Sequence, residues 1–258
     1  MKLRLARLWR IAATGISFAT FGAAGLVCGS VVLPIVRAWP GTEPERDFRC
    51  QYAVRRFFRA FVRMVEALGL MKVAVHGAER LQEPGQLVVA NHPTLLDAVF
   101  VMSVMPRADC VVKSAVTTNP FMRSVARCAG YLSNDLEGEL VDACVSRLRS
   151  GRSLLLFPEG TRSPRGALGP FQRGAAHIAF RSGRPFRPVV IRCDPPGLMR
   201  GQKWYDVADR SLEISIECCD LIYVEDAPAP GRGRGAAARR ATAELRDFFG
   251  KRLQTPEG

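Results

Sequence analysis

Residues 91–97 of this sequence (NHPTLLD) carry side chains that suit proton transfer. They follow an apolar run and place His92 and Asp97 five positions apart. A neutral histidine takes a proton from an alcohol, and a neighbouring carboxylate fixes its tautomer and stabilises the imidazolium. We therefore expect His92 to be a general base that Asp97 orients. Taken alone, the same pattern also fits a helix start at which Asp97 only complements the helix dipole.

A second stretch, residues 157–163 (FPEGTRS), carries groups that suit anion binding, again after an apolar run. Arg162 presents a planar fork of donors that matches a phosphate. Gly160 permits a close backbone approach. Glu159 is expected to orient Arg162, a substrate hydroxyl or the local hydrogen-bond network. A base, an orienting acid and a cation together indicate a transferase that acts on a phosphorylated alcohol, although this stretch also fits a surface turn.

From residue 71 onward, apolar runs typical of strands alternate with helical patterns. This alternation predicts an α/β fold, with a single mixed, mostly parallel sheet flanked by helices. Both motifs follow predicted strands, and open α/β sheets bind ligands at such strand ends. The predicted strands are residues 73–76, 87–90, 110–113, 153–157, 188–192 and 212–217, and the predicted helices are residues 94–105, 119–128, 138–149, 171–181 and 236–253.

The N-terminal segment is distinct, because residues 11–36 contain no charge. As a helix they would be roughly 39 Å long at ~1.5 Å per residue, and a bilayer core is ~30 Å thick. Four basic residues precede the segment, which favours a cytoplasmic position for that end: Lys2, Arg4, Arg7 and Arg10. The segment either spans the membrane or, with Pro34 and its glycines, bends back as a re-entrant hairpin. The same composition also fits a buried core helix or a cleaved signal peptide.

Residues 43–70 read as an amphipathic helix with an aromatic face and a basic face. Apolar positions such as Phe58, Phe61 and Val65 recur at helical spacing, opposite Arg56 and Arg63. Such a helix either lies in a membrane interface or packs on a core with its basic face in solvent.

The net charge indicates the kind of partner, and the cysteine pattern indicates the cellular setting. The formal net charge of +13 predicts an anionic partner, either nucleic acid or an anionic membrane surface. The eight cysteines show no C-x-x-C pairing, which favours a reduced, cytosolic setting over a disulfide framework. No zinc-ligand spacing is visible, so we expect no metal.

The two motifs resemble the H-x4-D and F-P-E-G-T-R motifs of the glycerolipid acyltransferases, the family of lysophosphatidic acid acyltransferases. The resemblance implies that His92 and Asp97 are the catalytic pair. It also implies direct attack by the acceptor hydroxyl on a thioester, with acyl-CoA or acyl-carrier protein as co-substrate and no cofactor. The residues that it assigns to the phosphorylated acceptor are Glu159, Gly160, Thr161 and Arg162.

A weaker block, running from Lys113 to Tyr131, resembles the family's middle acceptor-binding motif, with Lys113 as the phosphate partner. This chain lacks the acidic residue that usually follows the lysine and the arginine that usually closes the block. Because these two residues are missing, a different acceptor is also considered: an ornithine-type lyso-lipid or another hydroxylated lipid.

The resulting hypothesis divides the chain into N-terminal membrane-binding helices (residues 1–70) and an α/β acyltransferase domain (residues 71–258). The enzyme would transfer an acyl group to lysophosphatidic acid at the cytoplasmic face of the inner (plasma) membrane. Its partners would be membrane lipids, the lyso-phospholipid acceptor and the acyl donor. A membrane-anchored nucleic-acid-binding protein is the competing hypothesis of a different class. It explains the charge but neither motif, so no nucleic acid is expected.

Overall fold

A seven-stranded mixed sheet forms the centre of the computed structural model, which describes residues 2–119, 122–135, 139–224 and 233–254. The strand order is β1-β7-β6-β2-β5-β3-β4. Strands β6, β2, β5, β3 and β4 are parallel, β7 is antiparallel to β6, and β1 is parallel to β7. The predicted sheet type is confirmed. The strands are β1 (Met71–His76), β2 (Leu87–Ala90), β3 (Ala108–Val112), β4 (Leu132–Ser133), β5 (Ser153–Leu156), β6 (Phe186–Asp194) and β7 (Leu212–Cys218).

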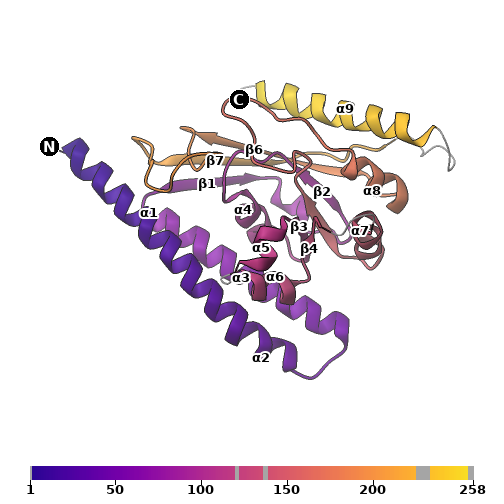
Figure 1. Ribbon diagram of the computed structural model, residues 1–258, viewed down its shortest axis with the longest axis horizontal. Helices are drawn as coiled ribbons and strands as arrows, with labels where there is room; N and C mark the ends of the chain where they lie inside the picture. The colour runs from indigo at the N-terminus through magenta and orange to yellow at the C-terminus, as the bar shows by residue number, and fades with distance from the viewer. Residues whose placement is uncertain (1, 120–121, 136–138, 225–232, 255–258) are drawn as a thin grey trace.

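Helices cover both faces of the sheet (Figure 1). Within β2, Val88 and Ala90 join the apolar cluster under α3, α4 and α6, whereas Leu87 and Val89 join the cluster under α7, α8 and α9. A strand buried on both faces reads as a continuous apolar run. The helices are α1 (Lys2–Val27), α2 (Leu33–Ala38), α3 (Glu43–Ala67), α4 (Asp97–Val104), α5 (Ser114–Thr118), α6 (Arg123–Ala129), α7 (Leu140–Arg149), α8 (Gly174–Ser182) and α9 (Arg234–Gln254), with a 3₁₀ turn at Ala78–Leu81.

The N-terminal helices lie along one side of the molecule (Figure 1). α1 continues through a π-helical segment, Cys28–Val32, into α2. In the part of the chain that the structure describes, Arg4–Ala38 is the one helical run long and apolar enough to cross a membrane. It is also packed against the domain. The ring of Phe21 lies 4.7 Å from that of Phe61, and a Cβ on Gly29 would lie only 2.6 Å from Cβ of Ser124 on α6.

α3 returns beside α1 and turns its aromatic face into the protein. It starts at a capping box, in which the side chains of Thr42 and Glu45 each accept from the other's backbone N–H. Phe58 and Phe61 are buried, whereas Arg59 and Arg63 are exposed. The core-packed interpretation of this helix therefore holds for its C-terminal half, whereas Phe48 and Tyr52 near its start are exposed. Most of the exposed apolar side chains of the N-terminal helices are on α1 and α2, at Leu5, Leu8, Trp9, Ile16, Val31, Ile35 and at Trp39 just beyond them.

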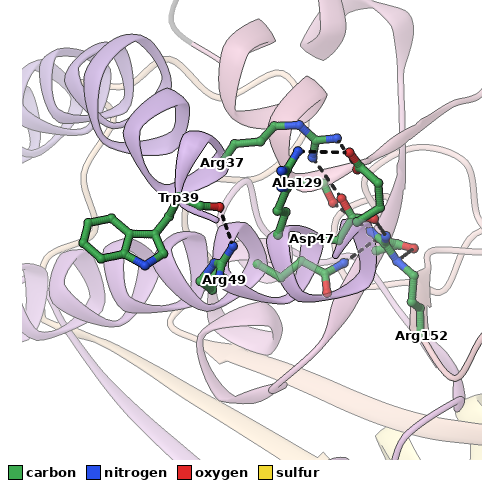
Figure 2. A network of polar contacts seen from close by, with 10 residues as sticks. Arg37, Trp39, Asp47, Arg49, Ala129 and Arg152 are labelled. Carbon is green, nitrogen blue, oxygen red and sulfur yellow. Dashed lines mark hydrogen bonds and ion pairs between the residues drawn. The ribbon is translucent and has the colours of Figure 1, made fainter. Parts of the chain in front are cut away.

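A buried ion-pair network ties these helices to the sheet (Figure 2). Asp109 of β3 is fully buried and accepts from Arg152 Nε at 2.8 Å and from Gln51 of α3 at 2.7 Å. Arg152 also bonds Asp47 of α3, which pairs in turn with Arg37 of α2. Burial raises the pKa of the Asp109 carboxyl, and the contacts with Arg152 oppose that rise. The boundary predicted at residue 70 thus falls between α3 and β1, but polar and apolar contacts cross it.

Several predicted element boundaries need correction. The helix predicted at residues 94–105 begins only at Asp97, because residues 91–96 form the loop that holds the active-site side chains. The helix predicted at residues 119–128 corresponds to α6, which begins at Arg123, and residues 120–121 of that prediction lie outside the described residues. The short helix α5 and the strand β4 were not predicted. Residue 138, at the start of the helix predicted for residues 138–149, lies outside the described residues.

Candidate active site

His92 and Asp97 meet at the carboxyl end of β2. The Nδ1 atom of His92 lies 2.7 Å from Oδ2 of Asp97, which is fully buried. The backbone N–H and the hydroxyl of Thr94 donate to the two carboxylate oxygens, each at 2.6 Å. Asp97 is the first residue of α4, so it both orients His92 and complements the helix dipole, and the two interpretations of its position hold together. Burial raises the pKa of the Asp97 carboxyl, and the bonds from His92 and Thr94 oppose the rise.

The remaining contacts of His92 leave Nε2 available. Its ring stacks on Phe157 with centroids 4.3 Å apart, and the side chain is 21 % exposed. Its carbonyl accepts from the backbone N–H of Ser163 at 2.7 Å. Among the described residues, no hydrogen bond reaches Nε2. With the Nδ1 proton directed to Asp97, Nε2 presents its lone pair to a substrate, as a general base requires.

Glu159 joins the two motifs from inside the protein. One carboxylate oxygen accepts from the His92 backbone N–H at 3.0 Å and from the Ser163 hydroxyl at 2.7 Å. The second oxygen accepts from the Gly169 N–H at 2.8 Å. We call Glu159, His92, Ser163 and Gly169 the Glu159 cluster. Since both oxygens are engaged by protein donors in a buried site, the geometry supports an orienting role for Glu159 rather than the predicted contact with substrate.

Gly160 and Thr161 form the turn after β5. Gly160 is exposed with a φ of +65°, and a Cβ there would meet nothing closer than 3.9 Å. The positive φ, and not a lack of space, therefore accounts for a glycine at this position, because residues with a Cβ rarely adopt such a φ. Thr161 is half-buried beside it.

Arg162 is half-buried and is held by a second loop. Its Nη1 donates to the carbonyls of Leu198 at 3.1 Å and Met199 at 2.9 Å. Leu198 has a φ of +55°, a left-handed conformation that costs energy for a branched side chain. The same carbonyl of Leu198 accepts from the N–H of Leu95 in the first motif. The loop thereby fixes the guanidinium relative to the first motif.

A groove of about 510 Å³ runs beside Arg162. Lys203 lines it as a second cation, and Trp204 closes one wall, where its ring lies against Gly15 of α1. We call this surface the Arg162 groove. Its lining residues are Gly15, Phe18, Leu95, Arg162, Leu198, Gln202, Lys203 and Trp204.

An apolar cavity of about 70 Å³ adjoins the Arg162 groove and shares Phe18, Leu198 and Trp204 with it. Side chains of α1 and α3 and the start of β1 form most of its wall, including Phe21, Phe61, Val65, Leu70 and Met71. An apolar chain entering from the Arg162 groove would be removed from water there, with its polar end left beside Arg162.

Comparison with known proteins shows sequence similarity to acyltransferases. The family model described as Acyltransferase matches residues 72–192, which contain both motifs. The matched stretch is also similar in sequence to 1-acyl-sn-glycerol-3-phosphate acyltransferases. It is 36 % identical over 130 residues to a putative 1-acyl-sn-glycerol-3-phosphate acyltransferase, acl-2, of Caenorhabditis elegans, covering 45 % of this chain and 44 % of that protein. A 1-acyl-sn-glycerol-3-phosphate acyltransferase of Saccharomyces cerevisiae is 30 % identical over 142 residues, covering 52 % of this chain and 47 % of that protein.

The chain thus spans less than half the length of these two acyltransferases. The fold comparison extends further. A crystal structure of the 1-acyl-sn-glycerophosphate (LPA) acyltransferase PlsC from Thermotoga maritima superposes with a TM-score of 0.72 and covers 99 % of each chain at 16 % identity. At that identity the likeness shows a common fold, which includes the N-terminal helices.

Lys113 is the residue that the family's middle motif suggests as a phosphate partner. It is exposed after β3, at the start of α5, and does not line the groove that Arg162 lines. The structure instead places Lys203 in that groove. Sequence reasoning missed Lys203 because loop 197–205 carries no family motif. Trp204, the next residue, was the feature of this loop that could have drawn attention to Lys203.

Proposed function

We propose that this acyltransferase moves a fatty acyl group from an acyl thioester, acyl-CoA or acyl-carrier protein, to the free hydroxyl of lysophosphatidic acid. The observation that carries the proposal is the bond of His92 Nδ1 to the buried Asp97, which leaves Nε2 available to a substrate. Arg162 of the second motif lines a cationic groove with Leu95 of the first motif. The names of the relatives point to the same acceptor. The chemistry is acyl transfer from sulfur to oxygen.

In this mechanism Nε2 of His92 removes the proton from the acceptor hydroxyl as its oxygen attacks the thioester carbonyl. Asp97 stabilises the imidazolium that forms, a form of help worth about 10²–10⁴ in rate. The tetrahedral intermediate then expels the thiolate. The C–S bond breaks, the new C–O ester bond remains, and the proton on Nε2 passes to the departing sulfur. No covalent enzyme intermediate is needed.

The Arg162 groove suits the acceptor. Arg162 and Lys203 provide two positive charges for a phosphate monoester, and the adjoining apolar cavity offers a contact for part of an acyl chain. Arg162 is pre-positioned by two carbonyls, so little side-chain entropy would be lost when it binds an anion.

The exposed apolar face of α1 and α2 supports association with a membrane. Trp9 and Trp39 are 52 % and 66 % exposed near the two ends of this face, and tryptophan favours the membrane–water interface. Because α1 packs along α3 rather than leaving the domain, we place this face on the cytoplasmic leaflet of the inner (plasma) membrane as a monotopic attachment. Co-flotation with anionic and neutral vesicles measures it, and failure to float with either would contradict it.

The test of function is transfer of a labelled acyl chain from acyl-CoA or acyl-carrier protein to lysophosphatidic acid in detergent micelles. His92→Ala should abolish product without unfolding the protein. Arg162→Ala should raise the KM for lysophosphatidic acid about 10–100-fold, as expected for loss of a charge-assisted contact, and leave the KM for monoacylglycerol unchanged.

A panel of further lyso-lipids, including an ornithine-type lyso-lipid, accompanies the assay. His92-dependent acylation of one of these, without product from lysophosphatidic acid, would change the acceptor and keep the chemistry. No product with any acceptor would refute the catalytic role of His92.

A further inference from the structure

A second groove, of about 820 Å³, lies between the loop of the second motif and α9 and shares no lining residue with the Arg162 groove. Asn91 and Pro93, the two neighbours of His92 in the chain, line its inner end together with Ser163. The C-terminal half of α9 forms the facing wall through Arg246, Gly250 and further residues. We call this surface the α9 groove. It thus contacts both chain neighbours of the base, whereas the Arg162 groove contacts neither.

The charges of the α9 groove suit an anion. Three cations line it, Arg192, Arg246 and Lys251, against one carboxylate, Asp247. Arg192 pairs with Glu217. Arg246 has no carboxylate partner among the described residues. Its Nε donates to the carbonyl of Gly169 at 3.2 Å, and one Nη donates weakly to Leu168 at 3.4 Å. These bonds hold the guanidinium in place without an ion pair to any described carboxylate.

The lining also argues against a lipid in this groove. None of the described residues that line it is aromatic, in contrast to Phe18 and Trp204 of the Arg162 groove. The apolar cavity adjoins the Arg162 groove through three shared residues, whereas it shares only Gly197 with the α9 groove. A long, polar, phosphorylated arm fits the α9 groove better than an acyl chain does. Its volume lies within the ~300–1,000 Å³ of small-molecule sites.

We propose that the α9 groove binds the phosphopantetheine arm of the acyl thioester donor, with its phosphate at Arg246 and Lys251 and its sulfur beside His92. This inference rests on the proposed function, which requires a thioester and a lyso-lipid to meet at one base. The arm is common to coenzyme A and to acyl-carrier protein, so the groove recognises the chemistry that both donors share. The two substrates then reach His92 through separate grooves.

The test compares donors with and without the phosphate. Arg246→Gln should raise the KM for acyl-CoA and for acyl-carrier protein about tenfold, as expected for one phosphate contact. With the N-acetylcysteamine thioester of the same acyl chain, which keeps the thiol end and lacks the phosphate, kcat/KM should stay within about twofold of wild type. The KM for lysophosphatidic acid should not change. Arg239→Gln is the matched control, because Arg239 is exposed on α9 outside the groove.

A second variant avoids the carbonyl bonds of Arg246. Gly250 lines the groove within α9, and a Cβ there meets no atom within 4 Å. Gly250→Phe should therefore fill the groove while the helix stays intact, and should raise the KM for both phosphorylated donors. Binding of free coenzyme A, measured by calorimetry, should weaken about tenfold in Arg246→Gln and stay unchanged in Arg239→Gln.

Several outcomes overturn the proposal. An equal loss with all three donors would show that Arg246 acts only by supporting Gly169 in the Glu159 cluster. A loss confined to acyl-CoA would place the contact on the nucleotide, and one confined to acyl-carrier protein would place it on the protein surface. If wild type binds coenzyme A through Arg246 but transfers no acyl group, the proposed function is refuted, and the assignment of the α9 groove as a binding site for the phosphopantetheine arm is not. If wild type acylates lysophosphatidic acid and neither variant changes donor KM or coenzyme A binding, the groove fails and the function stands.

Discussion

Replacing Glu159 with glutamine tests whether this residue positions the active site or binds the acceptor. Its two oxygens accept three hydrogen bonds, from the N–H groups of His92 and Gly169 and from the Ser163 hydroxyl. The amide of glutamine keeps one oxygen. Whichever way it turns, its NH₂ group faces one of the two backbone N–H groups, which is then buried without an acceptor.

The cost follows from that geometry. A buried donor without a partner costs about 1–3 kcal/mol, and the remaining bonds lose the carboxylate charge that strengthens them. We therefore expect the free energy of unfolding to fall by about 2–3 kcal/mol. For a chain of this size, that corresponds to a melting temperature about 4–12 °C lower.

Activity should fall through kcat. The His92 backbone would lose a fixed partner, and a shift of about 1 Å at a reacting group costs about 10²-fold. The KM for lysophosphatidic acid should change little, since Arg162 keeps its carbonyl partners. The assay is thermal unfolding by circular dichroism in detergent, together with steady-state kinetics. Ser163→Ala is the control, because it removes one donor, leaves both backbone bonds intact and should lower stability by only about 1 kcal/mol.

An unchanged melting temperature with a higher KM for lysophosphatidic acid would refute this reasoning. It would show that the Glu159 carboxylate binds the acceptor directly, as the family motif suggests.

Two further predictions use the buried carboxyls. Asp97→Asn should lower kcat by about 10²–10⁴ yet melt no lower than wild type at pH 8. Burial raises the folded-state pKa of Asp97. The stabilisation from its protonated form is therefore present at low pH and lost as pH rises through that pKa, and the asparagine variant avoids the loss. A variant that melts well below wild type at pH 8 but not at pH 5 would contradict this sign. Arg152→Met should cost about 3–5 kcal/mol at pH 8, because it leaves the buried Asp109 with Gln51 and the more distant Arg147, at 3.9 Å, as its partners. Denaturant titrations should show a smaller cost at pH 5, since the pKa of Asp109 is also raised by burial; a cost that grows at low pH would contradict the account.

The sheet was predictable because its inner strands are buried on both faces and read as apolar runs. β4 was missed because two residues, Leu132 and Ser133, leave no periodic pattern. The start of β6 was placed two residues late because Arg187 looked like a strand boundary. In the structure its guanidinium is buried, with Gln86 accepting at 3.0 Å and the carbonyl of Cys219 at 3.2 Å. Sequence pattern does not distinguish such a buried charge, whose partners are distant in sequence, from a charge on the surface.

The proximity of His92 and Asp97 was predictable because five positions bridge a loop and the first turn of a helix. The surroundings were not. Arg162 is fixed by carbonyls 36 and 37 residues later in the chain, and backbone acceptors carry no signature of residue type. The role of Glu159 was left open between three possibilities for the same reason. Its partners include two backbone N–H groups, which every residue except proline provides.

The buried ion-pair network also constrains the order in which the chain is completed on the ribosome. Asp47 and Arg152 are 105 residues apart, and Arg152 joins Asp47 to Asp109. α1, α2 and α3 are therefore synthesised long before the side chain that secures them to the sheet. During that interval Asp47 has only Arg37, its neighbour in the nascent helical hairpin. Final docking of the hairpin must wait for β5, so a stall in translation between Asp109 and Arg152 would leave the N-terminal helices attached to an unfinished sheet.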